Sequence, residues 1–393
     1  MKMSVVVLSS PSINAFQLLK AFINALHLAY GRFDVGKMSE RKVSFEYGAL
    51  ILRTRRLITL IEKLGKKYAK VWKVLSTVSI AISFFLLFFG IYAIHLNLIK
   101  YFTKPVEFSP VMPLIPGLTF GLDAIPFFII AVAVVMFSHE LAHALVAVSE
   151  GIPIKYIGLF FFLFLFGAFI EPDEAELKKA KLLTKLRVFS AGSASNFMVY
   201  VITILALTML FKPYGIFVEG TLEGYPAHGL LKRGDIILAL NGTEVTSVTE
   251  FSRIMAKAAP GSLLKILILR ERELVEFQIK LASSPYNKSR GFLGIYLTQY
   301  FAISVAPRAP WIYSISLFRA LQWILLLNIS VAVLNMLPIM VLDGGLTLRS
   351  ILQTKLKEKT VRRIEILLSS YLILILLANI IFSLKFPISR WLP

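Results

Sequence analysis

The chain contains no cysteine, only five histidines, and few charged residues, which make up 17% of its 393 residues. The absence of cysteine excludes disulfide bonds and thiolate ligands, so any metal site must use histidine, carboxylate and water. The scarcity of charge accompanies 57% hydrophobic residues and a mean hydropathy of +0.73. These values exceed what a water-soluble core requires. The composition therefore predicts a membrane protein that crosses the bilayer several times.

Five apolar runs are long enough to cross a hydrocarbon layer of about 30 Å. They cover residues 74–99, 124–148, 188–211, 320–342 and 366–384. A sixth run, 156–170, is shorter and contains two glycines. We interpret it as a re-entrant hairpin, which is tolerable in a membrane only where protein covers its backbone. The predicted fold is a multispanning α-helical membrane protein with about five to six transmembrane helices and one such hairpin.

The net charge of +20 is concentrated beside the apolar runs, which favours the positive-inside rule over nucleic-acid binding. Segment 1–73 carries 14 Lys or Arg against 4 acids, so we expect it to be cytoplasmic. Within it, 44–64 is predicted to form a short strand and a basic helix at the membrane surface. The loops 149–187 and 343–365 then also lie inside, and 212–319 lies outside. The chain is expected in the cell membrane, with the lipid bilayer as a partner and no nucleic acid.

Residues 212–308 have turns and charges and are predicted to form an inserted α+β domain outside the membrane. The short apolar strand 236–240 precedes an Asn-Gly turn at Asn241, a helix is expected over 248–259, and further strands over 265–270, 273–281 and 292–297. The chain is thereby divided into four parts. These are the basic N-terminal segment 1–73, membrane core 74–211, the insert 212–308 and membrane core 309–393.

The second apolar run contains the sequence His139-Glu140-Leu141-Ala142-His143. Residues i and i+4 face the same side of a helix, so His139 and His143 can bind one metal ion, and zinc suits this pair. Glu140 lies about 100° round the helix, where it can take a proton from metal-bound water. These groups cost several kcal/mol in hydrocarbon unless they are paired, metal-bound or hydrated. The alternative is that both histidines pack against other helices.

Hydrolytic zinc usually has three protein ligands and one water, so a third ligand is required. Asp123 is excluded, because its distance along a helix from His139 is about 24 Å. Glu171 and Asp343 remain, and Asp343 is favoured because it lies on the same predicted side as His143. Pro338 and Gly344 permit the backbone to bend this carboxylate toward the ion. We expect one zinc ion per chain.

These motifs together resemble the site-2 protease family of intramembrane zinc metalloproteases, in its PDZ-containing form. The similarity extends over residues 74–384. The family patterns H-E-x-x-H, G-x-x-x-N and N-x-x-P-x-x-x-x-D-G are matched by His139, Glu140, His143, Gly192, Asn196, Asn335, Pro338, Asp343 and Gly344. Ser193 and Met340 depart from the pattern, since proline is frequent at both positions.

The resemblance implies hydrolysis of peptide bonds in transmembrane protein substrates, with Glu140 activating a zinc-bound water. It implies that His139, His143 and Asp343 hold the ion, and that the hairpin pairs with an extended substrate strand. Substrate binding is implied for Asn335, Pro338, Gly192 and Asn196. The alternatives are that Asn335 bonds to Asn196 in helix packing and that Gly192 only permits close contact between spans.

The stretch 224–242 resembles circularly permuted PDZ domains of membrane proteases. PDZ modules bind an extended peptide at a sheet edge, and a backbone loop takes its carboxylate. That loop is predicted at Gly291, Phe292, Leu293 and Gly294. The alternative is a domain that only blocks access to the membrane site.

Two other functions compete with proteolysis. One is a non-catalytic PDZ-bearing membrane scaffold or chaperone, against which the intact His139-Glu140 pair, His143 and Asp343 argue. The other is a metal transporter, which predicts more acids within the membrane than this chain offers. The sequence carries no signal for oligomeric state.

Overall fold

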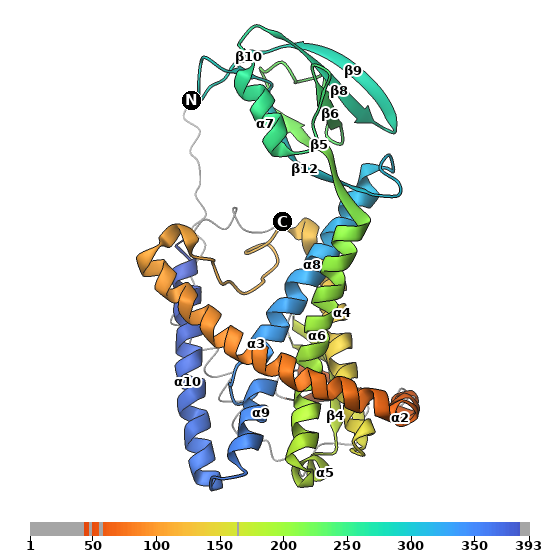
Figure 1. Ribbon diagram of the computed structural model, residues 1–393, viewed down its shortest axis with the longest axis vertical. Coiled ribbons are helices and arrows are strands. Elements are labelled where there is room, and N and C mark those ends of the chain that lie inside the picture. The colour runs from red at the N-terminus through yellow and green to blue at the C-terminus, as the bar shows by residue number, and fades with distance from the viewer. Residues whose placement is uncertain (1–42, 47–48, 55–57, 163–164, 386–393) are drawn as a thin grey trace, which may run out of the picture.

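A computed structural model describes residues 43–46, 49–54, 58–162 and 165–385. Within these residues, five helices are long and apolar enough to cross a membrane, which confirms the predicted multispanning fold. Figure 1 shows them as an elongated bundle with the insert at one end. The helices are α3 (Ala69–Thr103), α4 (Ile125–Ser149), α6 (Leu182–Leu210), α8 (Trp311–Asn335) and α10 (Glu358–Ser383).

The first span, α3, has 35 residues and crosses the bundle diagonally in Figure 1. At 1.5 Å per residue such a helix is about 52 Å long, which exceeds the thickness of the hydrocarbon layer. It follows the short helix α2 (Ile58–Lys67), whose buried Ile61 packs beside Val148 at the end of α4. The strongly tilted α3 therefore spans the bundle from the α2 end toward the opposite side.

The end predicted for the fourth span is wrong. We expected it to continue to residue 342, but α8 ends at Asn335 and a separate helix, α9 (Asp343–Leu352), begins eight residues later. Pro338 lacks the backbone N–H that would continue α8. The turn is closely packed, because a Cβ on Gly344 would clash with the Met336 carbonyl oxygen. Asp343 therefore begins a helix rather than ending one.

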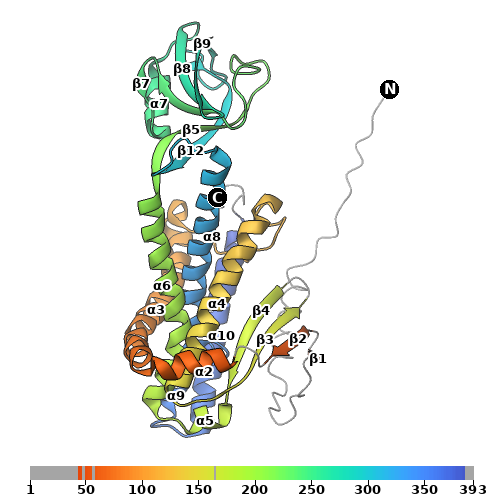
Figure 2. The same cartoon turned by 90° about the vertical axis from the view of Figure 1, so that its right-hand side faces the viewer.

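A four-stranded antiparallel sheet lies beside α4 in Figure 2. Its strands, in spatial order, are β1 (Val43–Glu46), β2 (Ala49–Thr54), β3 (Ile154–Phe162) and β4 (Leu165–Pro172). The predicted apolar hairpin is confirmed as the β3–β4 pair, in which Ile157 is opposite Ile170. The single strand expected within 44–64 is instead the hairpin β1–β2, and residues 1–42 lie outside the described part. Because β4 is last in the order, its second edge has no strand partner within the described residues.

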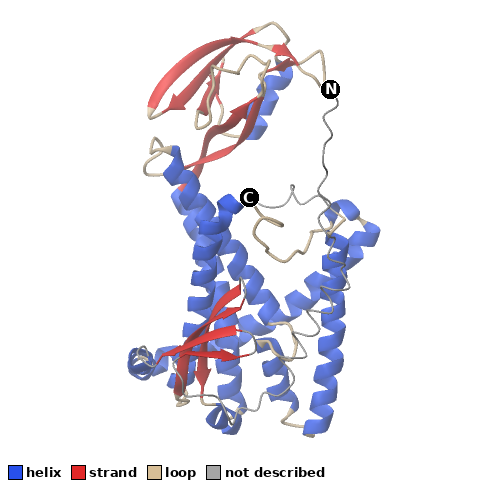
Figure 3. Cartoon of the chain, turned by 180° about the vertical axis from the view of Figure 1, so that it is seen from behind, coloured by secondary structure: helices blue, strands red, loops and turns tan. Residues whose placement is uncertain are grey.

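The insert is an α+β domain, as predicted, and Figure 3 shows its sheet apart from the sheet beside the spans. The turn at Asn241 and Gly242 has φ of 48° and 77°, as a tight Asn-Gly hairpin requires. Its buried core includes Ile216, Leu240 and Ile266. The elements are β5 (Phe211–Thr221), β6 (Ile236–Leu240), β7 (Thr243–Glu244), α7 (Val248–Lys257), β8 (Leu263–Arg270), β9 (Glu273–Lys280), β10 (Ala282–Ser283), β11 (Gly291–Phe292) and β12 (Ile295–Ile303).

Two paired strands join the insert to the membrane helices. The main sheet has the order β12-β5-β6-β8-β9, with β7 beside β6. Strand β5 follows α6 directly, β12 leads to α8, and the two strands pair along their length from Phe211 opposite Ile303 to Thr221 opposite Ile295. Trp311, at the start of α8, packs against Phe217 with ring centroids 5.1 Å apart. The insert is therefore attached to two spans through one hydrogen-bonded connection.

The opposite end of the bundle carries α9 and the short helix α5 (Glu174–Lys179), as Figure 1 shows. Asp173 caps α5, because its carboxylate accepts hydrogen bonds from the backbone N–H groups of Ala175 and Glu176. The Glu176 and Ala175 N–H groups and the nearby Lys155 hold the pKa of Asp173 below its ordinary value. This cap fixes the direction in which the chain leaves β4.

Candidate metal centre and active site

His139 and His143 on α4 and Asp343 at the start of α9 meet at one point. The two Nε2 atoms lie 3.1 Å apart, and Asp343 Oδ2 lies 3.4 Å from His139 Nε2 and 3.2 Å from His143 Nε2. The three side chains are only 10%, 16% and 12% exposed. The bend after α8 thus brings together residues from two distant parts of the sequence. Among the described residues, these three form a group that could hold a metal ion.

The chemistry of these three atoms fits zinc. Ligand atoms about 2.0–2.2 Å from a tetrahedral ion lie roughly 3.4 Å from one another, close to the separations observed here. His143 Nδ1 lies 2.7 Å from the Val188 carbonyl oxygen, so Nδ1 carries the proton and Nε2 keeps its lone pair. The site thus presents two imidazole lone pairs and one carboxylate.

Asn196 on α6 lies behind His139. Its amide is fully buried, 3.2 Å from His139 Nδ1, and it also accepts a hydrogen bond of 2.9 Å from the Ser138 hydroxyl. The nitrogen and oxygen of an amide are assigned from such networks. In the exchanged orientation the amide oxygen accepts the Nδ1 proton of His139, and the amide nitrogen donates to the Ser138 hydroxyl. That arrangement leaves His139 Nε2 as the ligand atom. The position of Asn196 therefore suits orientation of the imidazole.

Gly192 lies where α6 passes the two imidazoles. A Cβ at this position would lie 2.6 Å from His139 Nε2 and would also clash with His143 Nε2. No side chain larger than hydrogen fits without moving a ring. The glycine predicted from the motif thus permits α6 to approach the metal group.

Asn335 and Ser193 surround the Asp343 carboxylate. Asn335 Nδ2 lies 3.0 Å from Asp343 Oδ2 and 3.1 Å from His139 Nε2. The buried Ser193 hydroxyl donates a hydrogen bond of 3.4 Å to the same carboxylate oxygen. The contact of Asn335 is therefore with the metal group rather than with Asn196. The sequence did not predict this role for Ser193. The one sign of it in the sequence was that serine replaces the proline that is frequent at this position of the family pattern.

Glu140 contacts the edge of the hairpin. Its Oε2 atom accepts a hydrogen bond of 2.9 Å from the Ile170 backbone N–H. In an antiparallel ladder successive residues point their N–H groups to opposite edges, so this N–H faces away from β3. The residue beside His139 is thereby joined to the open edge of β4. Sequence reasoning missed this contact, because a backbone group leaves no residue signature.

The other predicted positions lie elsewhere. Glu171, the second candidate for third ligand, is on β4 opposite Tyr156 and outside the metal group. Asp123 forms an ion pair of 3.0 Å with Arg319 at the other end of α4. Pro338 lies in the turn between α8 and α9 and shapes the approach of Asp343.

Of the four residues predicted as a loop of the insert, Gly291 and Phe292 form strand β11, and only Leu293 and Gly294 lie between β11 and β12. Gly294 has φ of 78°, and a Cβ there would clash with the Tyr225 side chain. The Leu222 N–H donates to the Gly294 carbonyl at 2.8 Å, and the Ala227 N–H donates to the Leu293 carbonyl at 3.1 Å. The loop is thus fixed by the preceding segment, and peptide binding there stays a prediction.

The chain is similar to several known proteins. An uncharacterized protein of Methanocaldococcus jannaschii is 30% identical over 312 residues, which cover 76% of each chain. A membrane-bound transcription factor site-2 protease homolog of Arabidopsis thaliana is 27% identical over 212 residues, covering 50% of this chain and 40% of that protein. The PDZ domain of an SdrC-like protein from Listeria innocua is 28% identical, covering 21% of this chain and 92% of that chain, with a TM-score of 0.20. Residues 127–378 match the model of peptidase family M50, and the chain therefore belongs to this family of membrane metalloproteases, the site-2 proteases.

Proposed function

We propose that this protein is an intramembrane zinc metalloprotease that hydrolyses peptide bonds of transmembrane protein substrates. The observation that carries the proposal is the meeting of His139, His143 and Asp343 beside Glu140, on helices that are otherwise apolar. Buried groups of this kind are costly in a membrane unless they have a function. Their contacts leave two imidazole lone pairs and a carboxylate directed at one point, which a packing role does not require.

One zinc ion per chain would be held by His139, His143 and Asp343. When bound, zinc lowers the pKa of a water ligand to about 7 and polarises the carbonyl of the peptide bond. Val188 and Asn196 orient the two imidazoles through their Nδ1 atoms. These contacts preserve ligand geometry when other parts of the site move.

The Glu140 carboxylate is the proposed general base, and it accepts a proton from water and passes it to the leaving amine. It lies next to His139 in sequence and is held by the Ile170 N–H. Asn335 Nδ2 is the proposed donor to the substrate carbonyl oxygen, because it is a half-buried amide beside the metal group. A donor aimed at developing negative charge is an effective contribution to catalysis.

A helical substrate must unwind before it can be cut, since its peptide groups are satisfied within the helix. The free edge of β4 offers backbone groups to which an extended segment can pair. Ile170 places this edge within hydrogen-bond distance of Glu140. Strand pairing and hydrolysis would therefore occur at the same place.

The active site is proposed to face the cytoplasm and the insert the exterior. The loops at the α5 and α9 end carry clusters of Lys and Arg, as the positive-inside rule predicts for the cytoplasmic side. Within the insert, β12 is an edge of its sheet and directly follows the Gly291–Gly294 segment. That edge suits addition of a peptide strand. Steric control of substrate access is the other role proposed for the domain.

The test uses the full-length protein in lipid vesicles with a single-span reporter. Glu140→Gln should keep about one zinc per chain and abolish cleavage, because the amide cannot accept the proton. Glu107→Gln makes the same change at an exposed surface position and should cleave like wild type. His139→Ala should lose zinc. If the Glu140→Gln variant cleaved the reporter as fast as the wild-type protein, Glu140 would not be the general base. If the wild-type protein bound zinc but did not cleave the reporter, a non-catalytic scaffold would be favoured.

A further inference from the structure

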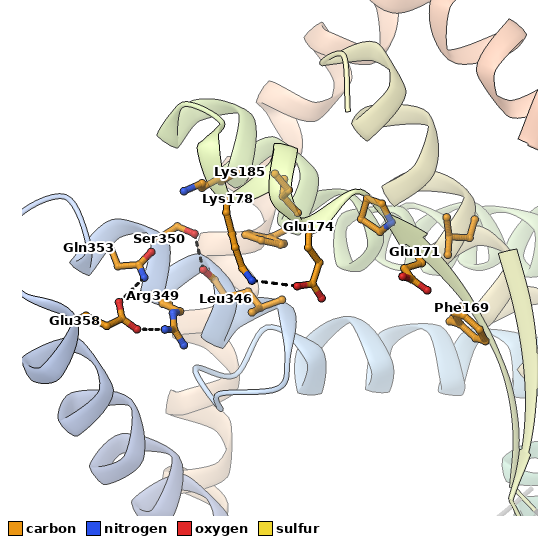
Figure 4. Close-up of a pocket in the computed structure, with 14 residues that line it drawn as sticks. Phe169, Glu171, Glu174, Lys178, Lys185, Leu346, Arg349, Ser350, Gln353 and Glu358 are labelled. Atoms are coloured by element: carbon orange, nitrogen blue, oxygen red, sulfur yellow. Dashed lines mark hydrogen bonds and ion pairs between the residues drawn. The ribbon is translucent and has the colours of Figure 1, made fainter. Parts of the chain in front are cut away.

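A cavity of 780 Å³ lies at the α5 and α9 end of the bundle, and Figure 4 shows its lining. It is enclosed by the end of β4, α5, the start of α6, α9 and Glu358 at the start of α10. Its volume is within the range of roughly 300–1,000 Å³ that is usual for ligand pockets. The cavity is therefore large enough to take several residues of an extended peptide.

The cavity adjoins the active site through Ile170. This residue lines the cavity and also donates its N–H to Glu140. Two residues later, Pro172 ends β4 and lines the same cavity. Proline has no N–H to offer a paired strand, so strand pairing along this edge ends there. A substrate segment that pairs near Ile170 would enter the cavity where the pairing stops.

The basic residues that line the cavity differ in whether they have an ion-pair partner. Lys178 pairs with Glu174 at 3.2 Å, and Arg349 pairs with Glu358. Lys185 on α6 is half-buried and lines the cavity, but its side-chain ammonium has no ion pair or hydrogen bond with any described residue. In Figure 4 its side chain reaches toward the α9 side of the cavity, away from Glu171. An ammonium that lines a cavity and has no partner favours binding of an anion there.

We propose that this cavity is a substrate subsite, and that Lys185 selects an acidic side chain in the segment next to the cleaved bond. The ligand class is an extended peptide segment of the substrate itself that carries Asp or Glu. The inference rests on the proposed proteolytic function. It adds a specificity residue that lies outside the H-E-x-x-H and N-x-x-P-x-x-x-x-D-G motifs.

The test compares three single-span reporters. They differ only in the residues next to the cleaved bond, on the side that would enter the cavity between α5 and α9. These residues are Glu in the first reporter, Gln in the second and Lys in the third. The full-length protein in vesicles should cleave the Glu reporter with kcat/KM about fivefold above the Lys reporter, as one partly exposed ion pair allows. Lys185→Glu should reverse this order. Lys185→Gln should bring the two rates together.

Lys181→Glu is the matched control, because it makes the same charge change one turn earlier on an exposed residue that does not line the cavity. It should keep the wild-type preference. Equal wild-type rates on the Glu and Lys reporters would overturn the subsite, as would a preference that Lys185→Glu and Lys185→Gln leave unchanged. The Gln reporter separates the two proposals. If the Glu140→Gln variant still cleaves it, the proteolytic mechanism is wrong. If the wild-type protein cleaves all three reporters at the same rate, only the subsite is wrong.

Discussion

The backbone N–H of Ile170 donates a hydrogen bond of 2.9 Å to the carboxylate of Glu140. This bond joins the open edge of the β4 strand to the residue that we propose as general base. A substrate strand that paired at this edge, as we propose, would compete for the same N–H. Binding of the substrate would then release the Glu140 carboxylate from the backbone and free it to contact water.

Ile170→Pro tests this link by removing the N–H while leaving an edge strand that tolerates proline. We expect kcat/KM for a membrane reporter to fall about tenfold or more, since a hydrogen bond to a charged group is worth roughly 1.5–3 kcal/mol. The measurement is reporter cleavage at several pH values. Phe169→Pro is the comparison, because its N–H faces β3 and its loss should instead lower the unfolding temperature. Wild-type kinetics for Ile170→Pro would show that the contact has no catalytic role.

Gly192→Ala should displace the imidazoles and reduce zinc binding. The added Cβ would lie 2.6 Å from His139 Nε2, and the rings cannot move freely because Val188 and Asn196 hold their other nitrogens. Zinc per chain, measured by mass spectrometry after dialysis, should fall well below one. Gly220→Ala is the control, since a Cβ there meets Tyr296 at an ordinary 3.7 Å. Full zinc content in Gly192→Ala would contradict the tight approach of α6.

Asn335→Ala should lower kcat and leave zinc content near one per chain. Removal of one donor to a developing oxyanion costs roughly a hundredfold to a thousandfold in other hydrolases. Asn328, two turns earlier on α8, donates instead to the Ile324 carbonyl, so Asn328→Ala should keep most of the activity. The readout is the rate at saturating reporter together with bound zinc. If Asn335→Ala lost its zinc instead, the residue would be a structural support of Asp343.

The sequence predicts the spans and the metal motif well, because both depend on local patterns. Five long apolar runs appear as helices, and the i, i+4 spacing of His139 and His143 puts both Nε2 atoms within 3.1 Å. The approach of Asp343 also follows from the bend that Pro338 and Gly344 permit. The end of α8 could not be predicted in this way, because the apolar run continues through the turn that follows the helix and gives no sign of where the helix ends.

Other parts of the site depend on contacts between distant segments. Ser193 reaches Asp343 across 150 positions of sequence, and no periodicity announces that contact. The Ile170 N–H belongs to the backbone, which every residue shares. Lys185 resembles its basic neighbours in the sequence, and only the packing of α5, α6 and α9 shows that it lines a cavity.

The most direct test of the account is anomalous diffraction at the zinc absorption edge from crystals of the full-length protein. We expect one anomalous peak per chain, about 2.0–2.2 Å from Nε2 of His139, Nε2 of His143 and a carboxylate oxygen of Asp343. A zinc peak bound elsewhere, or a peak on the two histidines with Asp343 beyond bonding distance, would contradict it.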